Sequence, residues 1–586
     1  MATADDQYSQ ASADFPLMRT DKWTEACGGP DGAHGAYPFD TQVLIIGAGF
    51  TGVTTGEKAL NCGGNVTILE ASSEVGGRLA SQTHDNGMPT HLAAMRFGKG
   101  MKELQDLVAR DGYTLTSTPF MNTDAVPTLL YIDGQLHYMD VEKDIIPDII
   151  KKPRAAFAAY DQGPLTVNGT TLVAPAELRT LFRENDNPLA LQAHQQLWAY
   201  QQAGLTIHQW FVKVFHENNT PPGGIRLTKD ECNILSKLYP TGDHTVFHDN
   251  ISAFEDQKWN TNGSTVNQGY FSVLKDGKPL LGDVGAYIRD RSAKLQERGV
   301  QVHCGHTVTK IEEIAAKDGR RRYRVRAGTS EGEKVFEAHY VFATPTLPAM
   351  VDMGLAAPGQ TLIHPKVAEA LTKVSTTPTS KYEWTIPADR AQNWVGKGLA
   401  RNIQGKSPLC PCYIMIEEQP DGSQKIKVHF YAWNTDAERL ASMGGDEVVR
   451  KNLIRMMASL LRDFKDPLGN DYTGFHTLLV SDSKVYSAVW QDKKYFGGGW
   501  TFPQAGEEYA AYLIQRNLEH EEYGVGLIGS AASGADAWIL RGVQNAKMAI
   551  ERSLRFTGGK VNHPNLAPIA FMGPPIKFPM ELMNMN

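Results

Sequence analysis

A glycine-rich turn joins an apolar stretch to the start of a predicted helix. Residues 43–46 are all aliphatic and run into Gly47, Gly49 and Gly52, and a second apolar stretch ends on Glu70 about 20 residues later. Gly47 suits a tight turn, Gly49 lets the backbone approach a phosphate, and Gly52 lets the helix pack closely on a sheet. In this strand–turn–helix–strand order, a pyrophosphate binds at the helix N-terminus and the acid binds a ribose. The segment therefore predicts a dinucleotide site.

A second glycine pair follows the acid. Gly76, Gly77 and Arg78 come directly after the stretch that ends on Glu70. A nicotinamide-binding domain does not need a further Gly-Gly-Arg element near the phosphates at this spacing. The pair therefore favours a different dinucleotide cofactor.

The sequence contains little that indicates another chemistry. We find no Ser-His-Asp arrangement, zinc-ligand spacing or phosphate-binding Lys-Ser/Thr loop. Cys410 and Cys412 flank a proline, but no second Cys or His pair stands nearby, so they are interpreted as ordinary cysteines beside a turn. No metal site is predicted.

Composition excludes several classes of protein. A length of 586 residues predicts two or three domains, and a net charge of -7 without a basic stripe argues against nucleic-acid binding. Six cysteines in so long a chain do not form a disulfide framework, and no apolar run is long enough to span a bilayer. The first residues lack the charged and apolar regions of a signal peptide. A soluble, cytoplasmic protein is expected.

Several motifs together resemble those of a known superfamily. They are the turn at residues 47–52 with Glu70, the Gly-Gly-Arg element, residues 94–97 (AMRF), residues 343–345 (ATP) and residues 529–538. In this order they resemble the flavin amine oxidase superfamily, and within it the bacterial L-amino acid oxidase and 2-monooxygenase branch that includes lysine 2-monooxygenase and tryptophan 2-monooxygenase. The likeness runs from about residue 40 to about residue 570. The first turn alone is unspecific, whereas the Met-Arg-Phe element combined with the C-terminal elements is fairly specific.

The resemblance implies a bound FAD. Some relatives carry a cysteine that bonds covalently to the flavin, and here that position is Gly499, so the FAD is expected to be non-covalent. The residues implied in binding it are Gly47, Gly49, Phe50, Thr51, Gly52, Glu70, Ala71, Gly77, Arg78, Ala94, Met95, Arg96, Val308, Trp490, Gly529, Ser530, Trp538 and Ile539.

Arg96 is the first candidate for substrate binding. A substrate with an α-carboxylate needs a planar, permanently charged, bidentate donor, which arginine supplies and lysine does not. The resemblance implies that Arg96 holds this carboxylate above the flavin, with the backbone of Met95 and Phe97 along the ring. The alternative is a surface arginine in a loop.

Lys381 and several tryptophans are the other candidates. The resemblance implies that Lys381 holds a water near the flavin and that Trp433, Trp500 and Trp538 wall the substrate cavity. An exposed strand lysine is an equal alternative for Lys381. For each tryptophan alone, core packing is the commoner explanation.

The sequence departs from relatives at three places. Ser530 stands where many relatives have an acid. Arg541 lies between Trp538 and Gly542, in a stretch that is one residue longer than in relatives. His91 replaces an acid five residues before Arg96. Arg541 either stabilises the reduced flavin or points into solvent, and the role of His91 stays open.

These residues require an α/β fold in which a Rossmann-like FAD-binding domain is built from separate segments beside a mixed-sheet substrate domain. We predict an N-terminal arm (1–40), FAD-binding segments (41–150, 266–355 and 501–556), a helical insert (151–265), a substrate-binding domain (356–500) and an extended tail (557–586).

The predicted function is FAD-dependent oxidation of an L-amino acid at its Cα–N bond with O2 as acceptor. The products are an imino acid and then a 2-oxo acid, ammonia and hydrogen peroxide, or an amide after oxidative decarboxylation. Nothing in the sequence decides between the oxidase route and the monooxygenase route. The alternatives are an amine oxidase whose substrate lacks the carboxylate, and a non-catalytic FAD-binding protein. No nucleic-acid or membrane partner is expected. The protein is expected to form a homodimer or a higher homo-oligomer.

Aromatic or bulky side chains are favoured as substrates over basic ones. The lysine enzyme holds its distal ammonium with an acid, whereas the corresponding residues 245–248 offer an apolar residue here. If the alignment with the lysine enzyme is shifted by a few residues, Asp243 or Asp249 would reach the pocket instead.

Overall fold

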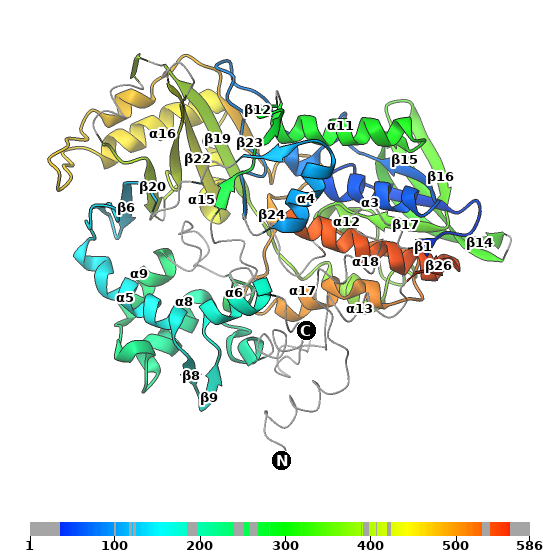
Figure 1. Ribbon diagram of the computed structural model, residues 1–586, viewed down its shortest axis with the longest axis horizontal. Helices are drawn as coiled ribbons and strands as arrows, with labels where there is room; N and C mark the ends of the chain where they lie inside the picture. The colour runs from blue at the N-terminus through cyan, green and yellow to red at the C-terminus, as the bar shows by residue number, and fades with distance from the viewer. Residues whose placement is uncertain are drawn as a thin grey trace.

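The computed structural model describes residues 35–98, 101–116, 120, 125–184, 197–238, 251–256, 268–280, 282–317, 319–387, 389–390, 398–405, 407–418, 424–529, 532 and 539–562. Figure 1 shows two sheet-based bodies side by side, with a mainly helical part below them.

A parallel five-stranded sheet forms the core of the first body. Its order is β13-β3-β2-β17-β25, and its strands are β2 (Gln42–Ile46), β3 (Asn65–Leu69), β13 (Gln301–His303), β17 (Tyr340–Ala343) and β25 (Val525–Leu527). Several of these strands are continuous apolar runs because a parallel sheet is buried on both faces. The strands come from both ends of the chain, as expected for an α/β fold built from discontinuous segments, and the predicted fold class is confirmed.

Helices and a second sheet cover this core. Helix α3 (Phe50–Asn61) follows the glycine turn and packs against α11 (Asp283–Glu297) and α18 (Ile539–Thr557). An antiparallel sheet of β14 (Thr307–Lys317), β15 (Arg320–Thr329) and β16 (Gly332–Ala338) shares a core with α12 (Leu347–Asp352), α13 (Pro365–Ala370) and α17 (Glu508–Gln515).

A seven-stranded sheet forms the second body. Its order is β23-β19-β22-β21-β20-β6-β7, with β6 (Thr128–Ile132), β7 (Gln135–Met139), β19 (Thr379–Ile386), β20 (Asn402–Gly405), β21 (Cys412–Glu418), β22 (Gln424–Trp433) and β23 (Tyr486–Val489). Strands β6 and β7 lie in the range that the sequence analysis gave to the first FAD-binding segment, but they pair into this sheet through β20.

Alternation along β19 and β22 gives this sheet two different faces. Tyr382, Trp384 and Phe430 belong to an apolar core that also holds residues of α15 (Asn434–Ser442) and α16 (Asp446–Leu460). The intervening residues include Lys381 and Glu383, which are buried as well. Since successive side chains of a strand point to opposite faces, one face is an aliphatic and aromatic core and the other carries charged groups.

The helical part contains α5 (Asp148–Gln162), α6 (Pro175–Glu184), α8 (Ile207–Phe211), a π-helix η2 (Val212–Glu217), η3 (Pro222–Gly224) and α9 (Lys229–Leu238). It also carries a hairpin of β8 (Leu165–Val167) and β9 (Thr170–Leu172). Its core is aromatic, with Tyr160, Trp198 and Trp210 in edge contacts.

The remaining short elements are β1 (Gly35–Ala36), η1 (Gly77–Leu79), β4 (Arg96–Gly98), α4 (Lys102–Arg110), β5 (Thr114–Leu115), β10 (Gln268–Tyr270), β11 (Val273–Lys275), β12 (Lys278–Pro279), β18 (Thr376–Thr377), η4 (Phe475–Leu479), β24 (Trp500–Thr501), η5 (Asn517–Glu519) and β26 (Lys560–Val561).

Candidate active site

A cavity of about 460 Å³ is lined by residues of both bodies. The glycine turn, Glu70 and the Gly-Gly-Arg element contribute to its wall from the parallel-sheet body. Lys381, Tyr431 and Trp433 contribute from the seven-stranded sheet. The cavity therefore combines the predicted dinucleotide site with the charged face of the second sheet.

The glycine turn is shaped as the sequence predicts. Gly47 has a φ of 98°, and a Cβ on Gly52 would lie 1.9 Å from the Gly47 carbonyl oxygen, so both positions require glycine. A Cβ on Gly49, by contrast, would meet nothing within 4 Å. This open space at the N-terminus of α3 fits the diphosphate of a dinucleotide.

Glu70 stabilises this turn from the end of β3. Its Oε2 accepts a hydrogen bond of 2.7 Å from the Ala48 amide, and its Oε1 accepts one of 2.9 Å from the Ser72 amide. Oε1 also accepts a hydrogen bond of 2.7 Å from Ser72 Oγ, whereas one further lone pair of Oε2 can accept another donor. Glu70 lines the cavity and so fits the predicted role of ribose acceptor.

The Gly-Gly-Arg element is tied to the glycine run near residue 500. Arg78 donates a hydrogen bond of 2.8 Å to the carbonyl of Gly499. A Cβ on Gly499 would lie 2.4 Å from Oγ1 of Thr379 and 2.7 Å from its Cβ. Any larger residue at position 499, including cysteine, therefore requires β19 or this segment to shift.

Arg96 begins the short strand β4, which pairs with β10. It is half-buried and lines the cavity, and its guanidinium carbon lies 4.9 Å from the centre of the Phe120 ring. A guanidinium can stack on an aromatic face and can also pair with a planar carboxylate through its N–H groups. The structure thus excludes the alternative of a surface-loop arginine.

Lys381 is buried, and the alternative of an exposed strand lysine is wrong. Its Nζ donates hydrogen bonds to the carbonyl oxygens of His91, at 3.0 Å, and Ala93, at 2.6 Å, and it lies 4.1 Å from the centre of the Tyr431 ring. Burial lowers the pKa of Lys381 well below its usual value, and the charge of Glu383 opposes that shift.

Three aromatic rings form one wall of the cavity. The ring centres of Trp433 and Trp500 lie 4.8 Å apart, and those of Tyr431 and Trp433 lie 4.7 Å apart, both nearly perpendicular. Trp490 lies elsewhere in the lining and donates a hydrogen bond of 2.9 Å to the Leu92 carbonyl. Edge-to-face packing fixes these rings against one another, so the wall presents a rigid apolar surface.

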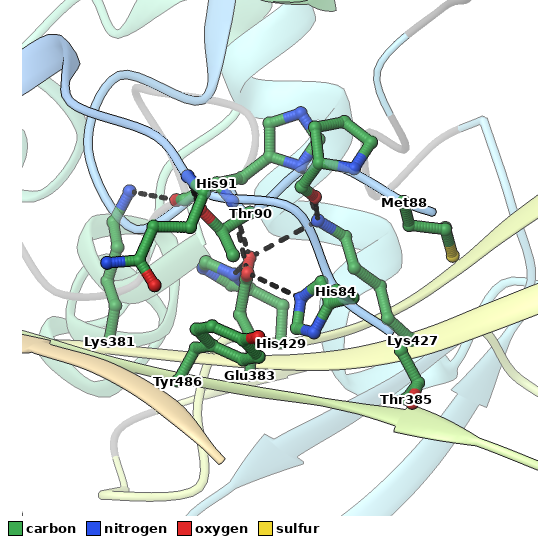
Figure 2. A network of polar contacts seen from close by, with 12 residues as sticks. His84, Met88, Thr90, His91, Lys381, Glu383, Thr385, Lys427, His429 and Tyr486 are labelled. Atoms are coloured by element: carbon green, nitrogen blue, oxygen red, sulfur yellow. Dashed lines mark hydrogen bonds and ion pairs between the residues drawn. The ribbon is translucent and has the colours of Figure 1, made fainter. Parts of the chain in front are cut away.

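A buried set of charged and histidine residues next to Lys381 is, apart from His91, absent from the sequence predictions. Glu383 receives contacts from His84, Lys427 and His429, as Figure 2 shows. We call His84, His91, Glu383, Lys427 and His429 the Glu383 cluster. No clear signal in the sequence marks this set, because polar residues at every second position, as in β19 and β22, are typical of strands with one face in solvent.

The other predicted cofactor residues are distributed as follows. Phe50, Thr51, Ala71, Gly77, Ala94, Met95 and Val308 line the cavity. In the described part of the lining, Gly52, Gly529 and Ile539 are absent, although Gly529 lies against Thr344, which does line the cavity. Ser530, Trp538 and residues 245–248 lie outside the described residues.

No group of three or more potential metal ligands occurs within the described residues. Cys410 and Cys412 are buried, and burial raises the pKa of both thiols. Within the described parts of the chain, no helix is both long enough and apolar enough to cross a membrane.

Comparison with known proteins gives a consistent result. The profile of the family described as "Flavin containing amine oxidoreductase" matches residues 50–533. Tryptophan 2-monooxygenase from Pseudomonas savastanoi is 24% identical over 558 residues, which is 91% of this chain and 93% of that protein. An L-amino-acid oxidase from Bothrops pauloensis is 23% identical over 219 residues, 36% of this chain and 39% of that one.

Solved structures share the fold. Cyclohexylamine oxidase from Brevibacterium oxydans IH-35A superposes with a TM-score of 0.58 at 14% identity, covering 89% of this chain and 99% of that chain. A redesigned putrescine oxidase superposes with a TM-score of 0.59 at 13% identity, covering 87% of this chain and 98% of that chain.

Proposed function

Since the profile of the flavin-containing amine oxidoreductases matches residues 50–533, the chain belongs to this family, and we propose that it uses a non-covalently bound FAD to oxidise an L-amino acid at the Cα–N bond. The observation that carries the substrate assignment is Arg96. Its guanidinium lies in the same cavity as Lys381, Trp433 and Trp500. A fixed guanidinium pairs with a carboxylate through two parallel hydrogen bonds, which an amine substrate without a carboxylate cannot form.

The residues that would hold the FAD lie along one side of the cavity. The amides at the start of α3 and the open space at Gly49 would hold the diphosphate, and Glu70 would accept from a ribose hydroxyl. Bound there, the flavin supplies a two-electron acceptor. The steric conflict between a Cβ at position 499 and Thr379 supports non-covalent binding, because a cysteine does not fit there without rearrangement.

The protein's own groups then orient the substrate. Arg96 fixes the carboxylate, which is one substituent of the α-carbon. The rings of Tyr431, Trp433 and Trp500 restrict the position of the substrate side chain, which is another. The water-excluding aromatic wall also strengthens the pairing between the carboxylate and Arg96, because charges interact more strongly at low local dielectric.

We propose O2 as the electron acceptor. An amino acid and O2 give an imino acid and hydrogen peroxide, and water converts the imino acid to a 2-oxo acid and ammonia. If the imino acid and peroxide stay together, they give an amide, carbon dioxide and water. Tryptophan 2-monooxygenase, the relative that aligns along nearly its whole length, supports inclusion of the second route.

The cavity wall favours an aromatic or bulky apolar side chain. Tyr431, Trp433 and Trp500 offer apolar surface, and a lysine ammonium placed against them would need a carboxylate partner. In the described part of the lining, the acidic residues are Glu70 and Asp352, and Glu70 already serves the glycine turn. The side-chain preference therefore follows from the lack of a second buried anion in that lining.

An anaerobic bleaching experiment tests this function. The purified protein is mixed with L-Phe, L-Trp, L-Lys, L-Arg, L-Glu or 2-phenylethylamine, and flavin absorbance is followed without O2. We expect fast bleaching by L-Phe and L-Trp and at most slow bleaching by 2-phenylethylamine. Bleaching by the amine alone would establish an amine oxidase, a preference for a charged amino acid would overturn the side-chain assignment, and no bleaching by any compound would favour a non-catalytic flavoprotein.

A further inference from the structure

The Glu383 cluster lies directly behind the segment that carries Arg96. Both carboxylate oxygens of Glu383 accept from the His91 amide at 3.0 Å, while Lys381 donates to the His91 carbonyl at 3.0 Å. Glu383 and Lys381 are two positions apart on β19 and so project from the same face. These two side chains therefore bind both main-chain polar groups of His91, Glu383 its N–H and Lys381 its carbonyl.

Glu383 is the centre of the cluster. Beyond the His91 amide, its carboxylate contacts His429 Nδ1 at 2.5 Å, His84 Nε2 at 3.3 Å and Lys427 Nζ at 3.4 Å. All these side chains are buried, and Figure 2 shows them converging on the carboxylate from two strands and the loop that precedes Arg96. A buried anion with this many donors stays ionised.

The cluster extends away from the cavity through His91. Its Nδ1 lies 2.6 Å from Lys427 Nζ, and its Nε2 lies 3.4 Å from Ser272 Oγ, which donates to Asp283 at 3.2 Å. Burial raises the pKa of Asp283 to about 7. The charged and titratable groups around Lys381 and Glu383 thus come from the loop before β4, from β4, β19 and β22, and from α11.

We propose that Glu383 is a positioning residue of the active site: it braces the segment that carries Arg96, and its charge sets the pH at which Lys381 loses its proton beside the bound substrate carboxylate. This inference rests on the proposed function, because it assigns the carboxylate to the same cavity. Among the surrounding groups, Glu383 favours the ammonium form of Lys381, whereas Arg96 and Lys427 disfavour it. Burial has the largest influence on the pKa of Lys381, and these three neighbouring charges adjust it.

The proposal predicts opposite shifts for two variants. Glu383→Gln keeps the shape and some hydrogen bonds but removes the anion, so Lys381 should lose its proton at a lower pH. Lys427→Met removes a competing cation and frees the carboxylate, so Lys381 should lose its proton at a higher pH. Each shift should be about one pH unit, at the lower end of the effect of a neighbouring charge in a buried site.

Binding of an unreactive carboxylate measures this shift without turnover. The dissociation constant of 3-phenylpropionate is determined between about pH 6 and pH 10 from the perturbation of flavin absorbance in the holoprotein. Arginine side chains keep their charge in proteins, so a loss of affinity with rising pH reports the loss of another cation near the carboxylate. Lys381→Met should abolish that loss, which assigns it to Lys381.

Glu508→Gln is the matched control. Glu508 is also a buried carboxylate, and it accepts hydrogen bonds from the Gly204 amide, Ser252 Oγ and the Gly506 amide, away from the Glu383 cluster. Its variant should keep the wild-type pH profile of binding, which separates loss of any buried carboxylate from loss of this one.

The outcomes distinguish this proposal from the proposed function. If 3-phenylpropionate does not bind at any pH, the assignment of a carboxylate substrate fails. If it binds and Glu383→Gln leaves the pH profile in place, only the role of Glu383 is refuted. If Glu383→Gln yields no folded flavoprotein, the double variant Glu383→Gln/Lys427→Met is compared with Lys427→Met: loss of the Lys381 proton at a lower pH in the double variant supports the proposal, and identical pH profiles overturn it.

Discussion

Replacing Arg96 with methionine tests the assignment of the substrate carboxylate. Methionine keeps the unbranched stem of the side chain but ends near the place of Nε. It therefore removes the guanidinium, whose carbon lies 4.9 Å from the centre of the Phe120 ring, together with the charge and every N–H donor. The half-buried position of Arg96 means that its partner loses water on binding. The substrate carboxylate would then be desolvated without a matching donor.

The size of the effect follows from the surroundings. Truncating one partner of a desolvated charge pair costs 2–5 kcal/mol, and the partial burial of Arg96 places the loss at about 3 kcal/mol, or about a hundredfold in rate. Lys381 cannot replace Arg96, because its Nζ already donates to the carbonyls of His91 and Ala93 and burial disfavours its charged form. The full loss should therefore appear.

The assay is anaerobic stopped-flow reduction of the flavin by L-Phe and, in parallel, by 2-phenylethylamine. With Arg96→Met the second-order rate constant for L-Phe should fall about a hundredfold, while any slow reduction by the amine should change little. Arg96→Lys should recover part of the loss, because the lysine ammonium restores a positive charge but cannot form the bidentate pair with the carboxylate. Flavin content is measured in each variant as the control for cofactor loss.

Equal losses for L-Phe and for the amine would refute the reasoning, because a general disturbance of the site affects both compounds. An unchanged rate with L-Phe would place the carboxylate elsewhere in the cavity.

Three further predictions concern the cofactor and stability. Acid or heat should release the flavin into the supernatant, and Gly499→Cys should not convert it to a covalent form, because the new Cβ would lie 2.4 Å from Thr379 Oγ1; flavin fluorescence on the denatured polypeptide in a gel is the contrary result. Gly49→Ala should fold with near wild-type stability yet retain little flavin. Gly52→Ala should destabilise the fold itself, since its Cβ would lie 1.9 Å from a carbonyl oxygen. Thermal denaturation of the apoproteins and the flavin content of each variant are measured, and similar behaviour of the two variants would contradict this prediction. Burial lowers the pKa of His429 to about 4, so between the ordinary histidine value and pH 4 the unfolded chain binds a proton that the folded chain does not. Stability should therefore fall as the pH falls through this window, by about 1 kcal/mol per pH unit, and denaturant unfolding of His429→Gln should show a shallower pH dependence; an equally steep dependence in the variant would count against this assignment.

The sequence by itself determined the fold of the segment that is predicted to bind the dinucleotide. The spacing of Gly47, Gly49 and Gly52 before a helix, with Glu70 at the end of the next strand, dictates a local conformation that needs only neighbouring segments. The structure reproduces it, including the close approach of Gly52 to the preceding turn. Such motifs are readable because glycine requirements and strand–helix order are local properties.

The tertiary structure decided the substrate side of the site. Arg96, Lys381 and Trp500 are far apart in the sequence, and their meeting in one cavity depends on how two sheets pack. Whether Lys381 was buried or exposed could not be read from β19, because a strand with polar residues at every second position usually faces solvent on that side. Here the loop before Arg96 covers that face, and Glu383 and Lys381 hold the loop through its main chain. The charge of each group in the Glu383 cluster is therefore set by burial and by partners from distant strands, which no local pattern of residues specifies.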